Sequence, residues 1–143
     1  MKLLIFLHGT LIMHSAAAGL PRPARVQQVM AQHPSVRDFS SYAPIGAAVK
    51  KCQGWADQGA TLVYLSSNQK EEDLQADQQV LSRFHFPEGE VYFRSECETY
   101  RDVALRVSPD VVIEDDCESI GGLAEMVWPN LPAERKPPIK SWR

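Results

Sequence analysis

The chain has 143 residues, of which 44% are hydrophobic and 23% are charged, and its formal net charge is −3. A chain of this length is expected to form one domain that buries a sufficient core without disulfides or structural metals. Its basic residues are scattered and form no stripe with interleaved aromatic side chains, so the sequence gives no support for nucleic acid as a partner.

The chain has three cysteines, Cys52, Cys97 and Cys117. An odd number without close spacing argues against a disulfide framework or a zinc knuckle, and reduced thiols are typical of a cytoplasmic protein. The apolar run after Lys2 is too short for a cleaved signal peptide, which we therefore do not expect. No stretch approaches the ~20 apolar residues of a membrane helix, so we expect no membrane partner.

The first expected element is a strand in residues 3–7, whose uniformly apolar side chains are typical of a strand covered on both faces. Residues 10–43 follow as a long connection rich in alanine, proline and serine, with one helix expected near residues 23–32. Connections of this length are usually functional, and we expect a flap over the site. Within it, His14 is expected to face solvent.

The middle of the chain alternates between helical and strand patterns. Pro44 is expected to open a helix whose apolar residues recur at helical spacing up to Trp55, and Gly59 is expected to end it. A strand at residues 61–65 and a helix at residues 70–84 follow. The inward-facing side chains of the second helix are expected to be Leu74, Val80, Leu81 and Phe84.

The last third begins with a short strand at residues 91–93, followed by an amphipathic helix at residues 100–107 and a buried strand at residues 111–113. Residues 118–126 are expected to form a short helix. The proline-rich tail, residues 127–143, is expected to supply a fifth strand at the edge of the sheet, where proline is better tolerated than in the centre.

Alternating strands and helices predict right-handed crossovers and a mostly parallel sheet with helices on both faces. We therefore expect a three-layer, Rossmann-like α/β fold in which residues 1–143 form a single domain. The first and fourth strands must be neighbours if their ends are to form one site. This condition gives the strand order 3-2-1-4-5.

Polar side chains follow three of the strands at their carboxyl ends, in residues 8–10, 66–68 and 114–116. The carboxyl ends of parallel strands gather at one edge of an open α/β sheet, where such sheets bind ligands. We expect His8, Ser66 and Asp115 to converge there.

The order and the residue types of these segments resemble the haloacid dehalogenase-like (HAD) superfamily, whose hydrolases include phosphatases. In that family the first strand ends in Asp-x-Asp-Gly-Thr, the second in Ser or Thr, and the fourth in an acidic pair. The resemblance covers about residues 2–122. It implies a divergent, capless member, since residues 10–43 are too short for more than a flap. Capless members often act on large substrates, so the expected partner is a phosphorylated small molecule or a macromolecule.

The sequence departs from the family at the reacting positions. Phe6 stands where the family has its nucleophilic aspartate, and a phenyl ring can neither attack phosphorus nor bind a metal. We expect Phe6 to pack in the core. His8 stands at the acid/base position, where an imidazole can still transfer protons, and it is expected either to act in the site or only to cap a turn. The family's lysine has no counterpart, and Arg94 is the nearest cation.

The remaining positions follow the family's pattern. The resemblance implies that Gly9, Thr10 and Ser66 bind phosphate, and we expect Asn68, where the next helix opens, and Arg94, the nearest cation, to bind it with them. It also implies that Asp115 and Asp116 bind a metal and that Asp116 is catalytic together with His8. A different interpretation of the acidic run is that it only complements the dipole of the following helix.

Two functions remain open. The first is a HAD-like domain without aspartyl-phosphate catalysis, retained as an anion-binding or partner-binding module. The second is a metal-dependent phosphohydrolase-like enzyme in which His8 works with Asp115 and Asp116. Without a carboxylate at position 6, magnesium binding is expected to be weak, whereas mixed histidine and carboxylate ligands suit a transition metal better.

Overall fold

The computed structural model describes residues 1–17, 21–31, 34, 38–114, 127, 130–134 and 140–142. Its core is a five-stranded sheet in the order β5-β4-β1-β6-β7, in which every neighbouring pair is parallel. The strands are β1 (Lys2–Phe6), β4 (Thr61–Leu65), β5 (Val91–Tyr92), β6 (Val111–Ile113) and β7 (Lys140–Trp142). Counted along the chain, this is the order 3-2-1-4-5, so the predicted α/β fold is confirmed.

The central strand β1 is apolar on both faces because it is covered on both faces. Its residues 3–5 pair with residues 62–64 of β4 on one side and with residues 111–113 of β6 on the other. Leu4 and Ile5 are completely buried. A strand in this position reads as a continuous apolar run, which is why its sequence signal was clear.

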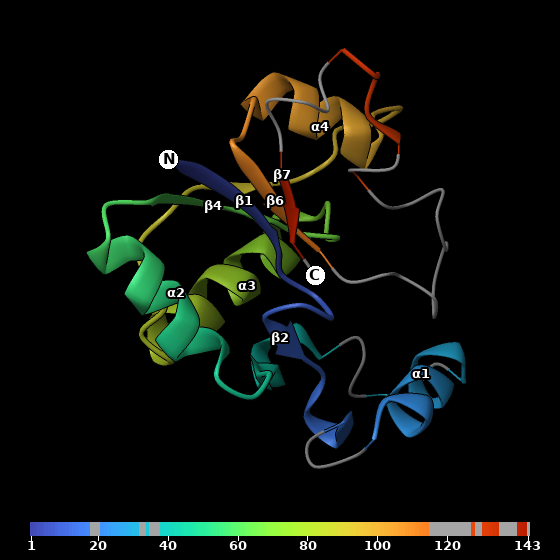
Figure 1. Cartoon of the computed structure of the whole chain (residues 1–143). Coiled ribbons are helices and arrows are strands. Elements are labelled where there is room, and N and C mark those ends of the chain that lie inside the picture. The colour runs from blue at the N-terminus through green and yellow to red at the C-terminus, as the bar shows by residue number, and fades with distance from the viewer. Residues whose placement is uncertain are drawn as a thin grey trace.

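Helices cover both faces of the sheet (Figure 1). The helices α2 (Ala48–Asp57) and α3 (Glu71–Arg83) lie on one face, and α4 (Tyr100–Val107) lies on the other. Because side chains alternate along a strand, Leu3 and Ile5 of β1 join one core cluster while Leu4 and Phe6 join the other. The molecule therefore has the three layers that the sequence predicted.

The connection after β1 contains structure that the sequence did not predict. Its elements are β2 (Ile12–Met13), η1 (Ser15–Ala17), α1 (Arg22–Met30), η3 (Phe39–Ser41) and β3 (Ala43–Pro44). The predicted helix near residues 23–32 is present as α1, whereas the short strands β2 and β3, which pair antiparallel in a separate sheet, were not expected.

Pro44 does not open a helix, contrary to the prediction. It lies in β3 opposite Ile12, and the next residue, Ile45, donates its backbone N–H to the carbonyl of Leu11 at 2.8 Å. This pairing holds the chain extended through residue 45, so α2 begins only at Ala48. Proline is common in the first turn of a helix, but here strand pairing with Ile12, far away in the sequence, keeps Pro44 extended.

None of the helices in the described ranges is long and apolar enough to cross a membrane. Two of the cysteines lie in these ranges, Cys52 buried and Cys97 exposed, and both are free thiols. Burial raises the pKa of the Cys52 thiol to about 12, so this side chain behaves as a small apolar core residue. Cys117 and the expected helix at residues 118–126 lie outside the described residues.

Candidate functional site

His8 lies just beyond the carboxyl end of β1, where the chain turns sharply. Gly9 has a positive φ of 84°, and its N–H donates to the carbonyl of Ile12 at 2.9 Å. A glycine suits this left-handed conformation because it has no Cβ to clash. The turn leaves His8 beside the end of the neighbouring strand β4.

Both ring nitrogens of His8 are hydrogen-bonded within the protein. Nδ1 lies 2.6 Å from Oγ of Ser67, and Nε2 lies 2.9 Å from Oδ1 of Asp77. The side chain of His8 is 11% exposed and that of Asp77 is completely buried. His8 is therefore held in one orientation between two partners from different elements.

Asp77 is the centre of this network. Its Oδ2 accepts hydrogen bonds from Oγ of Ser66 at 2.5 Å and from Nδ2 of Asn68 at 3.1 Å, while Oδ1 faces His8. A buried carboxylate needs such donors because removing its charge from water without partners costs several kcal/mol. Asp77 thus ties α3 to the ends of β1 and β4.

Asp77 was not among the predicted site residues. It stands three positions after Leu74 and three before Val80, on the helix face that was predicted to point inward. A charged residue on an apolar face is the signal that could have found it, since buried acids are nearly always paired. Its neighbours on that face were predicted correctly, because Leu74, Val80 and Leu81 are buried.

Aromatic rings enclose the other sides of His8. The centroid of its ring lies 5.5 Å from that of Phe39 and 5.3 Å from that of Tyr42. Burial, and secondarily the nearby charge of Asp77, raise the pKa of the Tyr42 hydroxyl above its ordinary value, so Tyr42 stays neutral. These rings come from the connection between β1 and α2, which therefore borders the site.

His14 is not exposed, and the prediction that it faces solvent is wrong. Only 4% of it is accessible. Its Nε2 lies 2.8 Å from Oε1 of Gln28, whose amide in turn donates to the carbonyl of Ala16 at 3.2 Å. The ring also packs edge-on against Tyr42. Strand β2 and helix α1 fold over this residue, which sequence reasoning placed on an open loop.

Most of the predicted phosphate ligands already have internal partners. Ser66 is buried and donates to Asp77, while Asn68 donates through its amide to Asp77 and through its backbone N–H to Ser66 Oγ at 3.0 Å. The backbone N–H of Gly9 is bound to Ile12. The structure thus brings Ser66, Asn68 and His8 together, but around the carboxylate of Asp77.

Thr10 and Arg94 differ from the other predicted ligands. Oγ1 of Thr10 and Nε of Arg94 are buried and have no hydrogen-bond partner within the part of the chain that the structure describes. The guanidinium of Arg94 lies 4.2 Å from the centroid of the Tyr100 ring, in a cation–π contact. Among the described residues, nothing accepts a hydrogen bond from these two atoms.

Phe6 packs in the core, as predicted. It is 7% exposed, and its ring meets that of Tyr100 edge-on with 5.0 Å between centroids. Tyr100 therefore contacts the ring of Phe6 and also has the guanidinium of Arg94 over its face. The position where the HAD pattern has its first aspartate is filled by an aromatic ring that belongs to the α4 side of the sheet.

The acidic run after β6 is described only at its first residue. Glu114 is 1% exposed, and its Oε2 accepts the backbone N–H of Val127 at 2.7 Å. Asp115 and Asp116, predicted as metal ligands, lie outside the described residues. Among the residues that are described, no group of three or more His, Cys, Asp or Glu side chains could hold a metal ion.

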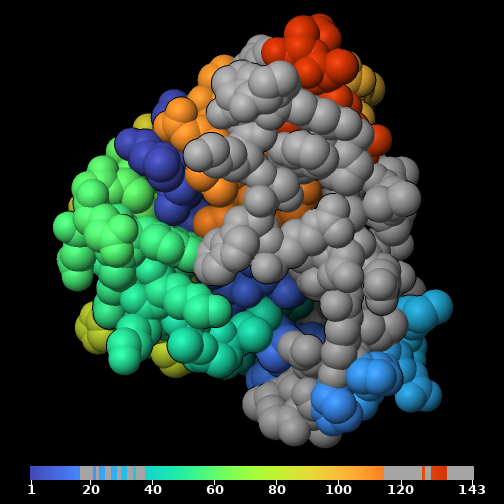
Figure 2. Space-filling view, in the orientation of Figure 1, coloured from blue at the N-terminus to red at the C-terminus, as the bar shows by residue number. Residues whose placement is uncertain are grey.

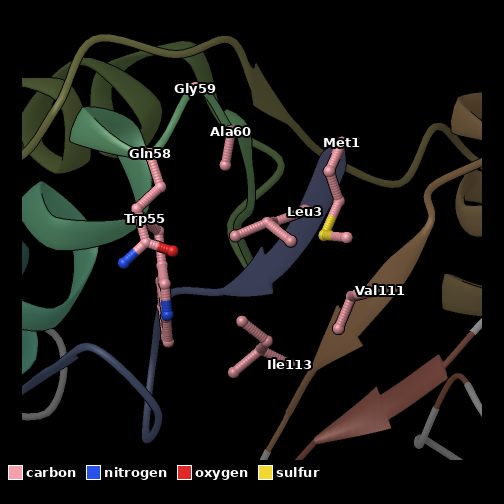
Figure 3. A pocket seen from close by; sticks show the side chains of 8 residues that line it. All are labelled: Met1, Leu3, Trp55, Gln58, Gly59, Ala60, Val111 and Ile113. Carbon is pink, nitrogen blue, oxygen red and sulfur yellow. The ribbon is translucent and has the colours of Figure 1, made fainter.

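A cavity of about 300 Å³ lies elsewhere on the molecule. Figure 2 shows the beginning of the chain at the surface between α2 and the segment that carries β6, and Figure 3 shows the cavity between them. It is lined by Leu3 of β1, by Val111 and Ile113 of β6 and by Trp55 of α2. None of the described residues that line it has an acidic or basic side chain, in contrast to the site around His8.

No protein-family model matches the chain, and no curated protein matches it. Solved structures do. The class C acid phosphatase from Bacillus anthracis has 14% sequence identity and a TM-score of 0.61, over 86% of this chain and 54% of that one. A second structure of that phosphatase, with tungstate bound, has 12% identity and a TM-score of 0.59, over 85% of this chain and 54% of that one.

The fold is HAD-like. A chain in the Pnkp1/Rnl/Hen1 RNA repair complex is also similar, with 12% identity and a TM-score of 0.54, over 83% of this chain and 37% of that one. This protein therefore spans about half the length of the acid phosphatase. At these identities the likeness concerns the fold alone, and the chemistry must be argued from the residues around His8.

We predict that Asp77→Ala lowers the free energy of unfolding by about 2–5 kcal/mol, because it leaves buried donors of His8, Ser66 and Asn68 without an acceptor. Urea titration followed by circular dichroism measures the change. Asp57→Ala, at an exposed acid on the last residue of α2, is the matched control and should change stability by less than about 0.5 kcal/mol. Equal stability of the Asp77 variant and the native protein would contradict the network.

Proposed function

We propose that this protein is a divergent, capless HAD-like domain that does not use aspartyl-phosphate chemistry and works as an anion-binding or partner-binding module. The observation that carries the proposal is Phe6. Its ring is buried against Tyr100 at the position where the HAD pattern supplies the attacking carboxylate. A nucleophile for phosphorus must be an ionised or activated group, and a phenylalanine at this position supplies none.

The state of His8 supports the binding module over the metal-dependent alternative. Its two ring nitrogens are engaged by Ser67 and Asp77, so metal binding or proton transfer to a metal-bound water would first require the loss of one of these bonds. Losing the contact with Asp77 would also leave Oδ1 of this buried carboxylate without its hydrogen bond from His8, which destabilises the fold. A role for Asp115 and Asp116 as metal ligands remains part of the alternative proposal.

Two donors without partners among the described residues indicate the class of ligand. Thr10 contributes a buried hydroxyl and Arg94 a buried N–H, both without partners among the described residues. A hydroxyl and a guanidinium are suited to the oxygens of an anion. We therefore propose a phosphorylated small molecule, or an anionic group on a macromolecule, as the ligand at this edge.

The connection between β1 and α2 is consistent with a capless domain. Pairing of β2 with β3 ties its two ends together close to the sheet, and its longest helix, α1, has nine residues. Figure 1 shows α1 at the periphery, away from the sheet. Such a connection borders the site without forming a second domain, which would leave room for a bulky partner.

We predict that the native protein does not hydrolyse 4-nitrophenyl phosphate in the presence of magnesium. The double substitution Phe6→Asp with His8→Asp is expected to give trace activity at most, because reacting groups misplaced by about 1 Å lose most of their rate. It should also destabilise the fold, since it puts charge into the core. Robust magnesium-dependent turnover by the native protein, abolished by replacing another aspartate, would overturn the proposal.

We predict weak binding of inorganic phosphate that depends on Arg94. Arg94→Met should raise the dissociation constant about tenfold, the cost of one charge-assisted hydrogen bond, as measured by isothermal titration calorimetry. Arg101→Met, which removes an exposed cation from α4, is the matched control and should bind like the native protein. Equal losses in both variants would indicate only general charge attraction.

Magnesium is predicted to bind weakly at millimolar concentration, because position 6 provides no carboxylate and magnesium demands near-ideal geometry. Calorimetry with Asp115→Asn and Asp116→Asn tests this. Tight magnesium binding that either substitution abolishes would contradict the proposal. Zinc or nickel that binds more tightly than magnesium would favour the histidine-assisted enzyme instead.

A further inference from the structure

Three side chains at the carboxyl edge of the sheet form a hydrogen-bonded chain that the proposed binding role does not use. Ser67 Oγ lies 2.6 Å from Nδ1 of His8, and Nε2 of His8 lies 2.9 Å from Oδ1 of Asp77. The three residues come from three places in the fold: the loop after β4, the turn after β1 and the inner face of α3. Their order is hydroxyl, imidazole, carboxylate.

The positions of the protons in this hydrogen-bonded group follow from its two outer members, Ser67 and Asp77. An ionised carboxylate only accepts hydrogen bonds, so in the neutral imidazole the proton sits on Nε2 and is donated to Asp77. Nδ1 then carries a lone pair and accepts the hydroxyl proton of Ser67. The backbone N–H of Ser67 also points at Nδ1, at 3.4 Å. This is the tautomer that allows Nδ1 to remove a proton from the hydroxyl.

The exposure of the three side chains decreases from Ser67 to His8 to Asp77, and catalysis requires the reacting hydroxyl to be the accessible one. Ser67 is exposed, the side chain of His8 is 11% accessible, and Asp77 is fully buried. Ser66 and Asn68 already donate hydrogen bonds to Oδ2 of Asp77. Asp77 therefore has donors of its own, and the contact between Ser67 and His8 is not needed to stabilise its charge. The hydroxyl that would react is the member that solvent can reach.

The surroundings indicate what could bind there. The rings of Phe39 and Tyr42 flank the imidazole and offer an apolar wall. Helix α3 begins a few residues after Ser67, and no side chain caps its first turn. The same turn carries Glu71, Glu72 and Asp73, whose charges repel an anionic substrate. An uncharged ester with an aromatic group fits these conditions.

We propose that Ser67 is a nucleophile activated by His8 and oriented through Asp77, and that it transfers acyl groups from uncharged aryl esters to water. The assignment rests on geometry and roles, as it does wherever a serine, a histidine and an acid meet on unrelated folds. It is independent of the proposed anion binding through Arg94, and either can fail without the other.

The reaction balances without a cofactor. The Ser67 hydroxyl gives its proton to His8 Nδ1 while Oγ bonds to the ester carbonyl carbon. The bond from that carbon to the aryloxy oxygen then breaks, and the phenol leaves with the proton from Nδ1. A water attacks the acyl-serine in the same way, its proton passing through Nδ1 to Oγ, and the carboxylic acid is released.

The test uses the full chain, 4-nitrophenyl acetate as substrate and an alkyl fluorophosphonate as covalent probe. The probe should label Ser67, identified by peptide mass spectrometry, with loss of fluoride. Ser67→Ala and His8→Ala should each lower the esterase rate by at least about tenfold, since a positioned base contributes roughly 10²–10⁴. Ser95→Ala, at another exposed serine, is the matched control and should keep the native rate and labelling.

Asp77 is a positioning residue and needs a different readout. Proton–nitrogen NMR of the His8 imidazole should show the Nε2–H tautomer in the native protein and a mixture of tautomers in Asp77→Asn. Unfolding curves check that each variant is folded, and if His8→Ala or Asp77→Asn does not fold, the exposed Ser67→Ala decides. A native esterase rate in Ser67→Ala, labelling elsewhere than Ser67, or the Nδ1–H tautomer in the native protein would overturn the proposal.

Discussion

The carboxylate of Asp77 is the constraint on which the edge of this sheet depends. It is fully buried, and a buried charge is tolerated only where donors surround it. Here the donors come from the ends of the two adjacent central strands, through His8 after β1 and through Ser66 and Asn68 after β4. One side chain of α3 therefore fixes the conformation of the loops that would form the ligand site.

This arrangement changes what those loops can do. In the HAD pattern the hydroxyl after the second strand holds the phosphate, whereas here Ser66 holds an internal carboxylate. A donor that is already bound to a charged acceptor gains little from an external anion, because one strong hydrogen bond would only replace another. Residues outside the network, such as Thr10 and Arg94, are therefore the better candidates for contact with an anion.

The α4 side of the sheet holds Phe6 at the position where the HAD pattern has an aspartate. Phe6 packs edge-on against Tyr100, and Arg94 lies over the face of the same ring. An aromatic ring in a well-packed core gains from burial and from ring contacts, while a carboxylate at this place would need a cation. The packing of the α4 layer thus favours an aromatic ring over a carboxylate at position 6.

The sequence alone determined the sheet and its order. Uniform apolar runs at β1, β4 and β6 mark strands buried on both faces, and the requirement that polar strand ends meet placed β1 at the centre. It also predicted that Phe6 belongs to the core. The apolar runs are local signals, because a strand buried on both faces must be apolar whatever covers it.

Only the tertiary structure decided what surrounds His8. The partner of its Nε2 is 69 positions away and that of its Nδ1 is 59 positions away, and neither pairing has a local signal. The pairing of β2 with β3, which holds Pro44 extended and brings the connection back over His14, is equally non-local. Sequence patterns report periodicity within one element, whereas a hydrogen bond between elements is set by how those elements pack.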